Sequence, residues 1–138
     1  MQFLVGAYRF RRHGLSNMFK NLSCRRLERK AMIKVSDKET LNVLLQRNRR
    51  VLILFCASWC PFCRSFFSVF DKRVAKYSFD STVRAYIDDY DNPLWEDYSI
   101  EAVPTVILFE QAQVVRRLDA ELGAGLSEKQ FAEWLVKL

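Results

Sequence analysis

Two stretches made almost entirely of apolar residues limit the possible folds of this chain more than any other feature. The first, VLILFC, runs from Val51 to Cys56, and the second, TVILF, runs from Thr105 to Phe109. A strand that is apolar at every position is covered on both faces, whereas a strand with one solvated face alternates apolar and polar residues. We therefore expect two central strands in a sheet that lies between layers of helices.

The segments around these strands predict a regular alternation of strands and helices. Ser36 or Asp37 begins a helix, and Glu39 lies at the capping-box position behind Ser36. Ser127, with Gln130 three residues later, begins the last helix in the same way. The predicted order is β-α-β-α-β-α-β-β-α, with strands at residues 32–35, 51–56, 82–87, 105–109 and 114–118 and helices at residues 37–48, 61–77, 91–97 and 127–138.

This alternation is typical of an α/β domain in which a central mixed sheet carries helices on both faces. The chain has 138 residues, which is long enough for one buried core and too short for two ordinary domains. We expect that domain at residues 32–138. Residues 1–31 are predicted to form a basic N-terminal extension.

The net charge of +6 is concentrated in this extension. Residues 1–34 hold nine Lys and Arg and one acid, Glu28, for a charge of +8, whereas residues 35–138 hold thirteen basic and fifteen acidic residues, for a charge of −2. Affinity for nucleic acid depends on clustered positive charge. We therefore expect no nucleic-acid partner for the domain.

The extension permits three interpretations. Apolar residues between Leu15 and Leu27 recur at helical spacing among Lys and Arg, which indicates a basic amphipathic helix. This segment fits an organelle-targeting presequence, a surface helix for anionic lipid, or a disordered leader, and we favour the leader. Its longest apolar run is too short for a membrane span or a secretory signal. We expect a cytoplasmic monomer, with the mitochondrial matrix as the alternative location.

Two cysteines lie at the predicted start of a helix, separated by Pro61 and Phe62. If Cys60 is the N-cap and Pro61 the first helical residue, Cys63 lies one turn on, within disulfide range. Unpaired N–H groups and the positive end of the helix dipole favour a thiolate at Cys60. We assign Cys60 as the nucleophile and Cys63, which is more covered, as the resolving thiol with the higher pKa.

Two structural interpretations of this dithiol are weaker. A zinc site needs a second pair of Cys or His, and the remaining candidates are Cys24 and His13 in the extension and Cys56 inside a predicted strand. A structural disulfide that closes so short a loop contributes little chain entropy. We therefore expect no metal and no other cofactor, and we expect Cys56 to be a small buried apolar residue.

Four segments of the domain resemble thioredoxin. They are FCASWCPFC (55–63), which is similar to the strand and active-site turn of that family, AYIDDYDNP (85–93), similar to its third strand, VPTVILF (103–109), similar to its cis-proline segment, and GAGLSEKQF (123–131), similar to the approach to its last helix. The resemblance covers residues 32–138. It implies the thioredoxin fold and a thiol–disulfide oxidoreductase that reduces or exchanges protein disulfides, with an unidentified reductase as electron donor.

The resemblance also implies a docking groove for client proteins beside the dithiol. A cis peptide bond is expected at Val103–Pro104, where the Val103 backbone would pair with a client segment as an added strand. The residues that the resemblance assigns to client binding are Trp59, Pro61, Phe62, Val103, Pro104, Thr105, Ala124 and Gly125.

Some positions depart from the family's pattern. Pro61 and Phe62 replace the usual Gly-Pro spacer and look more like glutaredoxin, so we expect a more oxidising dithiol than in a typical thioredoxin. Leu54 replaces the buried carboxylate that the family places six residues before the first cysteine. Arg84 stands where the family has a companion lysine, and it is a candidate for tuning the pKa of the dithiol.

Two alternative functions follow from these departures. A glutaredoxin-like, glutathione-coupled oxidoreductase is suggested by the spacer, but Ala102 stands where glutaredoxins typically place Thr, and the sequence has no Gly-Gly-x-Asp anchor. A non-catalytic peptide-binding or chaperone module would tolerate the loss of both cysteines. We favour the disulfide oxidoreductase, because a dithiol at a helix cap has no use in a pure binder.

Overall fold

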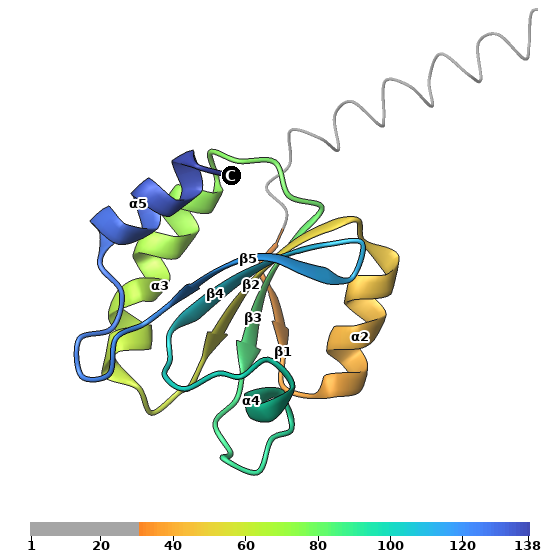
Figure 1. Ribbon diagram of the computed structural model, residues 1–138, viewed down its shortest axis with the longest axis horizontal. Coiled ribbons are helices and arrows are strands. Elements are labelled where there is room, and N and C mark those ends of the chain that lie inside the picture. Colours follow the sequence, from red (N-terminus) through yellow and green to blue (C-terminus); the bar gives the residue numbers. More distant parts are fainter. Residues whose placement is uncertain (1–30) are drawn as a thin grey trace, which may run out of the picture. The chain divides into compact units, whose positions relative to one another are not determined.

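The computed structural model describes residues 31–138, whose five strands form one mixed sheet in the order β1-β3-β2-β4-β5 (Figure 1). Strands β1 (Ile33–Val35), β3 (Ser81–Tyr86) and β2 (Arg50–Cys56) are parallel to one another. Strand β4 (Thr105–Glu110) runs antiparallel to β2 and to β5 (Gln113–Asp119). The predictions for residues 1–30, including those for His13 and Cys24, lie outside the described residues.

Helices cover both faces of this sheet. Figure 1 shows α3 (Pro61–Val74) and α5 (Glu128–Val136) on one face and α2 (Lys38–Arg47) on the other. The short helix α4 (Leu94–Asp97) lies at the end toward which β1, β2 and β3 point. The predicted element order and the mixed sheet between helices are confirmed. No helix within residues 31–138 is long and apolar enough to cross a membrane.

The two apolar runs form the central strands, as predicted. All residues from Val51 to Cys56 are fully buried, and Val106 and Ile107 of β4 are fully buried beside them. Strand β5 forms one edge of the sheet, and its residues are exposed or half-buried, among them Arg116 and Arg117. Burial on both faces therefore distinguishes the central strands from the edge, as their composition predicts.

Local capping signals set the starts of two helices. The Asp37 carboxylate accepts hydrogen bonds from the Thr40 backbone N–H at 2.7 Å and from the Thr40 hydroxyl at 2.9 Å, so Asp37 is the N-cap of α2 and the capping box expected from Ser36 is wrong. The predicted capping box of α5 is confirmed. Gln130 N donates to Ser127 Oγ at 3.1 Å, and Ser127 N donates to Gln130 Oε1 at 3.0 Å.

Several element ends differ from the predicted ones. Helix α3 ends at Val74 rather than near residue 77, and α4 begins at Leu94 rather than at residue 91, because the Asn92 side chain accepts the Leu94 N–H in a local turn. Strands β4 and β5 extend further than predicted, which leaves only Gln111 and Ala112 between them. Both have positive φ, 51° and 63°, as a tight two-residue hairpin turn requires.

A cluster of aromatic rings fixes α3 against α5 and the sheet. Phe131 of α5 lies 5.2 Å from Phe66 and 5.6 Å from Phe70 of α3, measured between ring centroids, and all three side chains are buried. Burying such a side chain stabilises a fold by roughly 1.5–3 kcal/mol. The cluster thereby holds in place the helix whose first turn carries the two cysteines.

Candidate active site

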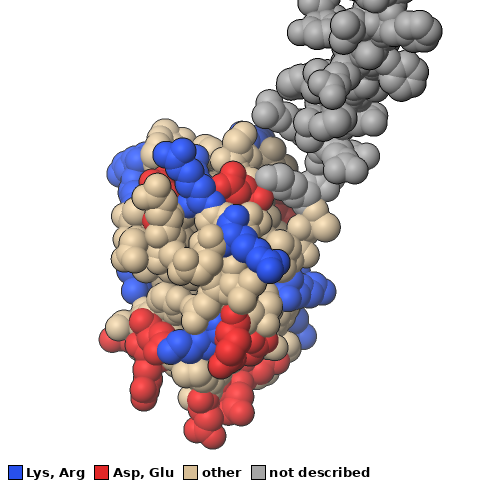
Figure 2. Space-filling view, turned by 90° about the vertical axis from the view of Figure 1, so that its right-hand side faces the viewer, with Lys and Arg blue, Asp and Glu red and all other residues tan. Residues whose placement is uncertain are grey.

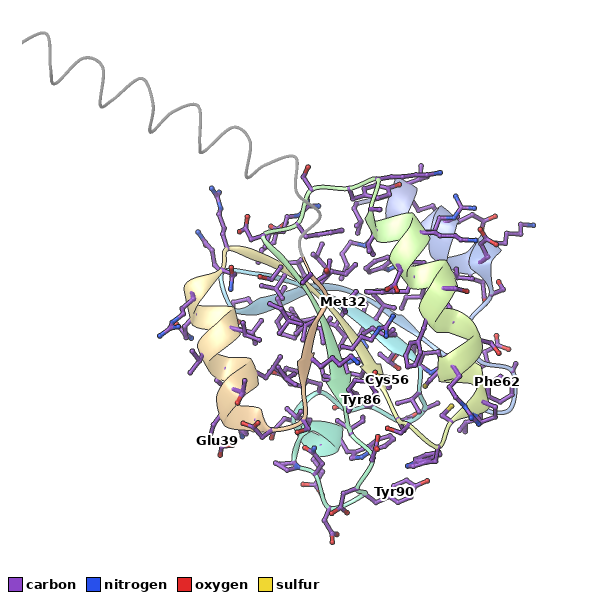
Figure 3. All side chains as sticks on the ribbon, turned by 180° about the vertical axis from the view of Figure 1, so that it is seen from behind. Met32, Glu39, Cys56, Phe62, Tyr86 and Tyr90 are labelled. Atoms are coloured by element: carbon purple, nitrogen blue, oxygen red, sulfur yellow. The ribbon has the colours of Figure 1, made fainter. Side chains whose placement is uncertain are left out.

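The dithiol lies where β2 ends and α3 begins. Cys60 is the N-cap of α3, with φ −89° and ψ 115°, and Pro61 follows as the first helical residue. The Arg64 N–H donates to the Cys60 carbonyl at 3.2 Å, which closes the first turn and places Cys63 within it. Figure 3 shows Phe62 of the spacer at this end of α3 and Cys56 in β2. The predicted placement of both cysteines in the first helical turn is confirmed.

The two cysteine residues differ slightly in burial. Cys60 is 5% exposed, whereas Cys63 is 0% exposed, and both are free thiols. A client disulfide that approaches from solvent therefore meets Cys60 and not Cys63. This difference arises because Cys63 lies inside the first turn, on the face of α3 that packs on the core, whereas Cys60 lies at the helix end.

The contact of the Cys60 sulfur differs from the expected one. In the part of the chain that the structure describes, the Cys60 side chain makes no capping hydrogen bond to the first turn of α3. The thiol instead donates to the carbonyl oxygen of Val103, with the sulfur 3.7 Å from that oxygen. The contact brings the expected nucleophile next to the backbone that was expected to pair with a client.

Burial determines the protonation state of the second thiol, Cys63. Desolvation raises the pKa of the Cys63 thiol far above its usual value, and a hydrogen bond with Cys60 acts in the same direction. A hydrogen bond from the Ala57 backbone opposes these effects, since it stabilises the thiolate. Cys63 is therefore a neutral thiol near pH 7, which is the state expected of a resolving cysteine before a client disulfide arrives.

The segment after α4 contains the expected cis peptide bond. The Val103–Pro104 bond is cis, and both residues are buried beside Cys60. The Thr105 side chain is fully buried, and its hydroxyl donates to the Ala102 carbonyl at 2.7 Å. The Thr105 side chain thus supports the segment 102–104, and a role of Thr105 in client binding stays a prediction.

The predicted docking residues next to the dithiol make two separate sets of contacts. Phe62, 41% exposed, packs directly on Gly125, because a Cβ built on that glycine would lie 2.9 Å from Phe62 Cβ. Pro61 and Ala124 are exposed. Trp59, 47% exposed, leans the other way, toward the loop after β3. The structure thus brings Phe62 and Gly125 together, whereas Trp59 contacts Asp88 and Tyr90.

Two residues beside Trp59 were missed by sequence reasoning. Asp88 accepts the Ser58 backbone N–H on its carboxylate at 2.8 Å, and its carbonyl accepts the Trp59 indole N–H at 2.9 Å, so Asp88 fixes the turn before Cys60. The Tyr90 ring lies 5.6 Å from the Trp59 ring. Both belong to the segment AYIDDYDNP, whose resemblance to the family was the available signal.

Leu54 and Arg84 are neighbours in the pairing of β2 with β3. Leu54 is fully buried, so no carboxylate occupies that position. The Arg84 guanidinium donates to both Asp71 oxygens, at 2.8 and 2.9 Å, and lies 4.2 Å from the centroid of the Phe67 ring. Its charge acts on a different buried thiol, Cys56. A role of Arg84 in tuning the Cys60–Cys63 pair stays a prediction.

Cys56 behaves as the sequence suggests for a buried residue. Its side chain is fully buried, and its thiol donates to the Ala85 carbonyl with a sulfur–oxygen distance of 3.7 Å. Desolvation raises the pKa of Cys56 to about 12, and the charge of Arg84 opposes this rise. No group of three or more His, Cys, Asp or Glu within residues 31–138 is arranged to hold a metal ion.

Comparison with known proteins decides the family. The thioredoxin family model matches residues 31–136. The chain belongs to the thioredoxin family. Thioredoxin from Mycobacterium tuberculosis is 31% identical over 111 residues, which cover 80% of this chain and 96% of that protein. Thioredoxin from Chlamydia caviae is 33% identical over 98 residues, which cover 71% and 89%. Thioredoxins are protein disulfide oxidoreductases that work through a dithiol, and this chain is a thiol–disulfide oxidoreductase.

Solved thioredoxin structures have the same fold. The reduced thioredoxin pre-protein of Schistosoma mansoni matches with a TM-score of 0.65 at 24% identity, over 78% of this chain and 98% of that one. Mitochondrial thioredoxin 3 of Saccharomyces cerevisiae matches with a TM-score of 0.63 at 19% identity, over 78% and 95%. The predicted thioredoxin fold is therefore confirmed.

Proposed function

We propose that this protein reduces disulfides of client proteins with Cys60 as the nucleophile and Cys63 as the resolving thiol. The Cys60 thiolate attacks one client sulfur, which forms a Cys60–client disulfide and releases the other client sulfur as a thiolate. The Cys63 thiolate then attacks Cys60, which forms the Cys60–Cys63 disulfide and releases the second client sulfur. Two electrons pass to the client, and the two protons of the dithiol end on the two client thiols.

The unequal burial of the two sulfurs carries this proposal. Cys60 retains some exposed surface and Cys63 has none, so only Cys60 is open to attack on a client. Once the mixed disulfide has formed, Cys63 is already next to Cys60 in the same helical turn, and the second attack needs no diffusion. The raised pKa of Cys63 keeps it protonated until then, which leaves time for a client to dock.

Client docking is proposed at the surface on both sides of Cys60. Phe62, with Gly125 packed behind it, and Trp59 offer exposed apolar surface, and Pro61 and Ala124 lie beside them. The Val103 backbone is the proposed partner of an extended client segment, since added strands are held by main-chain hydrogen bonds. Pro104 orients that backbone.

The oxidised protein needs two electrons to return to the dithiol. A bifunctional thioredoxin reductase/thioredoxin of Mycobacterium leprae is 28% identical over 91 residues, so in that relative a reductase and a thioredoxin share one chain. We propose a thioredoxin reductase as the electron donor here. We also propose a cytoplasmic location, with the mitochondrial matrix as the alternative. A fluorescent protein fused behind residues 1–31 distinguishes them by where it accumulates.

Trapping experiments test the two cysteine roles. Cys63→Ser is expected to accumulate a disulfide between Cys60 and the client, visible as a mass increase that a reductant reverses, because the second attack is lost. Cys60→Ser is expected to lose insulin reduction altogether. Cys56→Ala serves as the control and should retain activity, because Cys56 takes no part in either step. Full activity of Cys60→Ser would show that the roles are assigned wrongly.

The Pro-Phe spacer is proposed to make the dithiol more oxidising than a typical thioredoxin. Thioredoxin and glutaredoxins differ by roughly 40–70 mV, and the spacer here is of the glutaredoxin kind. Equilibration of the protein with glutathione buffers of known ratio measures the potential. A value at or below that of thioredoxin, about −270 mV, would contradict this part of the proposal.

A further inference from the structure

Three aromatic rings form a row that begins next to the nucleophile. The Trp59 ring lies 5.6 Å from the Tyr90 ring, and the Tyr90 ring lies 5.5 Å from the Trp95 ring, between centroids. Tyr90 is 73% exposed, and Figure 3 shows it near the end of the molecule that carries α4. Trp59 and Tyr90 are exposed and Trp95 is partly buried; the Tyr90 and Trp95 rings are stacked, and the Trp59 ring is tilted against Tyr90. Neighbouring exposed apolar side chains of this kind mark interaction sites. We call these three residues the aromatic row.

The backbone after β3 holds the row in place. The Trp59 indole N–H donates to the Asp88 carbonyl at 2.9 Å, and the Trp95 indole N–H donates to the carbonyls of Ile87 and Asp89, each at 3.1 Å. Both indole donors are therefore satisfied within the protein. What the row offers to a partner is ring faces rather than hydrogen-bond donors.

The segment that carries Tyr90 and Trp95 is rich in carboxylates. Between Arg84 and Arg116 the chain has seven Asp and Glu and no Lys or Arg. Figure 2 shows Asp and Glu side chains gathered at the lower end of the molecule, the end at which α4 lies in Figure 1. Lys38 pairs with Asp97 of this segment at 2.7 Å, whereas within residues 31–138 no Lys or Arg forms an ion pair with Asp88, Asp89, Asp91 or Glu96, which neighbour Tyr90 and Trp95 in the sequence.

The combination of aromatic rings and carboxylates fits a cationic side chain of a partner. A guanidinium or ammonium group is attracted to the face of an aromatic ring and to nearby carboxylates, and both attractions act on the same charge. An apolar partner would remove water from the carboxylates without replacing it, and an anionic partner would be repelled. Since the two steps measure 5.6 and 5.5 Å, the Trp95 ring lies no further from the Trp59 ring than about three extended residues reach, at 3.3–3.6 Å per residue.

We infer that the aromatic row and its carboxylates bind an Arg or Lys side chain of the client, about three residues from the cysteine that Cys60 attacks. The protein therefore selects disulfides that lie in positively charged segments. This inference rests on the proposed function, since it takes Cys60 as the point of attack. The other candidate occupant is the chain's own residues 1–30, which carry eight Lys and Arg and one acid.

Matched peptides test the preference. Three disulfide peptides differ only at the third residue from the attacked cysteine, which is Arg, Gln or Glu, and the rate constant for their reduction is measured with the full-length protein. We expect the Arg peptide to react about tenfold faster than the Glu peptide at low salt. In 1 M salt the ratio should fall to about two, because the screening length shrinks to roughly 3 Å.

Two sets of variants locate the effect. Asp91→Asn with Glu96→Gln is expected to lower the Arg-to-Glu ratio to about threefold, and Tyr90→Ala to slow the Arg peptide about two- to fivefold more than the Gln peptide. Glu110→Gln with Glu133→Gln removes the same charge away from the row and should keep the tenfold ratio. An unchanged ratio in the first variant would overturn the inference.

The outcomes separate the inference from the proposed function. If no peptide is reduced, the proposed function fails. If all three peptides are reduced at the same rate, the dithiol works and the inference alone fails. In a variant with Arg25→Gln and Arg26→Gln, faster reduction of the Arg peptide with no change for the Gln peptide would show that residues 1–30 compete with the client Arg, which supports the inference; an Arg preference that is absent from the full-length protein and from this variant overturns it.

Discussion

The contact between Phe62 and Gly125 allows a matched test of the surface beside the dithiol. Gly125 has φ +71° and Gly123 has φ +77°, so alanine at either position is forced into the same unfavourable backbone region. At Gly125 the new Cβ would also meet Phe62 Cβ at 2.9 Å and two ring atoms at 3.0 Å. At Gly123 no described atom lies within 4 Å of the new Cβ. Both substitutions therefore incur the backbone cost, and only the one at buried Gly125 adds the clash.

The magnitude follows from these geometries. Left-handed backbone costs an L-residue roughly 1–2 kcal/mol, and both variants lose this amount. A change of rotamer cannot relieve the contact at Phe62 Cβ, because that atom is fixed to the first turn of α3. The turn around Gly125 must move instead, and such overpacking costs about 1–3 kcal/mol more. We expect Gly125→Ala to lower the free energy of unfolding by about 2–5 kcal/mol and Gly123→Ala by about 1–2 kcal/mol.

Thermal unfolding of the reduced proteins, followed by circular dichroism, measures the difference. A difference of 1 kcal/mol corresponds to roughly 4 °C or more in a domain of this size. Gly125→Ala should also reduce client disulfides more slowly, whereas Gly123→Ala should not. Phe62→Ala in the Gly125→Ala background removes two of the three close contacts and should restore part of the lost stability. Equal destabilisation by the two alanines would refute the reasoning, since it would show that the clash costs nothing.

Three further predictions concern the fold. Burial raises the pKa of Cys56 to about 12, so its contribution to stability is complete below pH 9.0 and is lost as the pH rises toward about 12. Urea unfolding of the reduced proteins should therefore show up to about 4 kcal/mol more alkaline destabilisation in the wild type than in Cys56→Ala. An equal dependence of the unfolding free energy on pH in the two proteins would count against this prediction. Ser127→Ala should cost about 1 kcal/mol through the lost capping box, measured against exposed Ser68→Ala as control. Phe131→Ala should cost about 3–5 kcal/mol in denaturant unfolding, against almost nothing for exposed Val136→Ala, and a loss under 1 kcal/mol would show that the ring cluster does not hold α3.

The sequence predicts the sheet and its helices well because their signals are local. The unbroken apolar composition of β2 and β4 specifies burial on both faces, and the pair Ser127 and Gln130 specifies a helix start without help from distant residues. The choice between Ser36 and Asp37 as N-cap cannot be made from local signals in this way. Both side chains can cap, and the Ser36 carbonyl accepts a hydrogen bond from Asn92, 56 residues away, which no local pattern shows.

The same distinction, between features set by neighbouring residues and features set by distant contacts, separates the predictable and unpredictable parts of the site. Proline after Cys60 places both cysteines in one helical turn, so the dithiol follows from four residues. The partner of the Cys60 sulfur is Val103, 43 residues away, and the burial of Thr105 depends on where β4 lies in the sheet. The aromatic row joins Trp59 to Tyr90 in the loop after β3 and to Trp95 in the short helix α4, and the backbone path of that loop has no periodic signal in the sequence.

The open edge formed by β5 has a consequence for self-association. An unpaired strand edge is a template on which a second copy can add its own strand. If two β5 strands paired in antiparallel fashion, Arg116 and Arg117 of each would come close to the same residues of the other, and like charges placed opposite one another are destabilising. Strand β1, with three residues, is a short template at the other edge. We therefore expect concentrated solutions of the folded protein to resist edge-to-edge aggregation, and to do so less well at high salt or after both arginines are replaced by Thr.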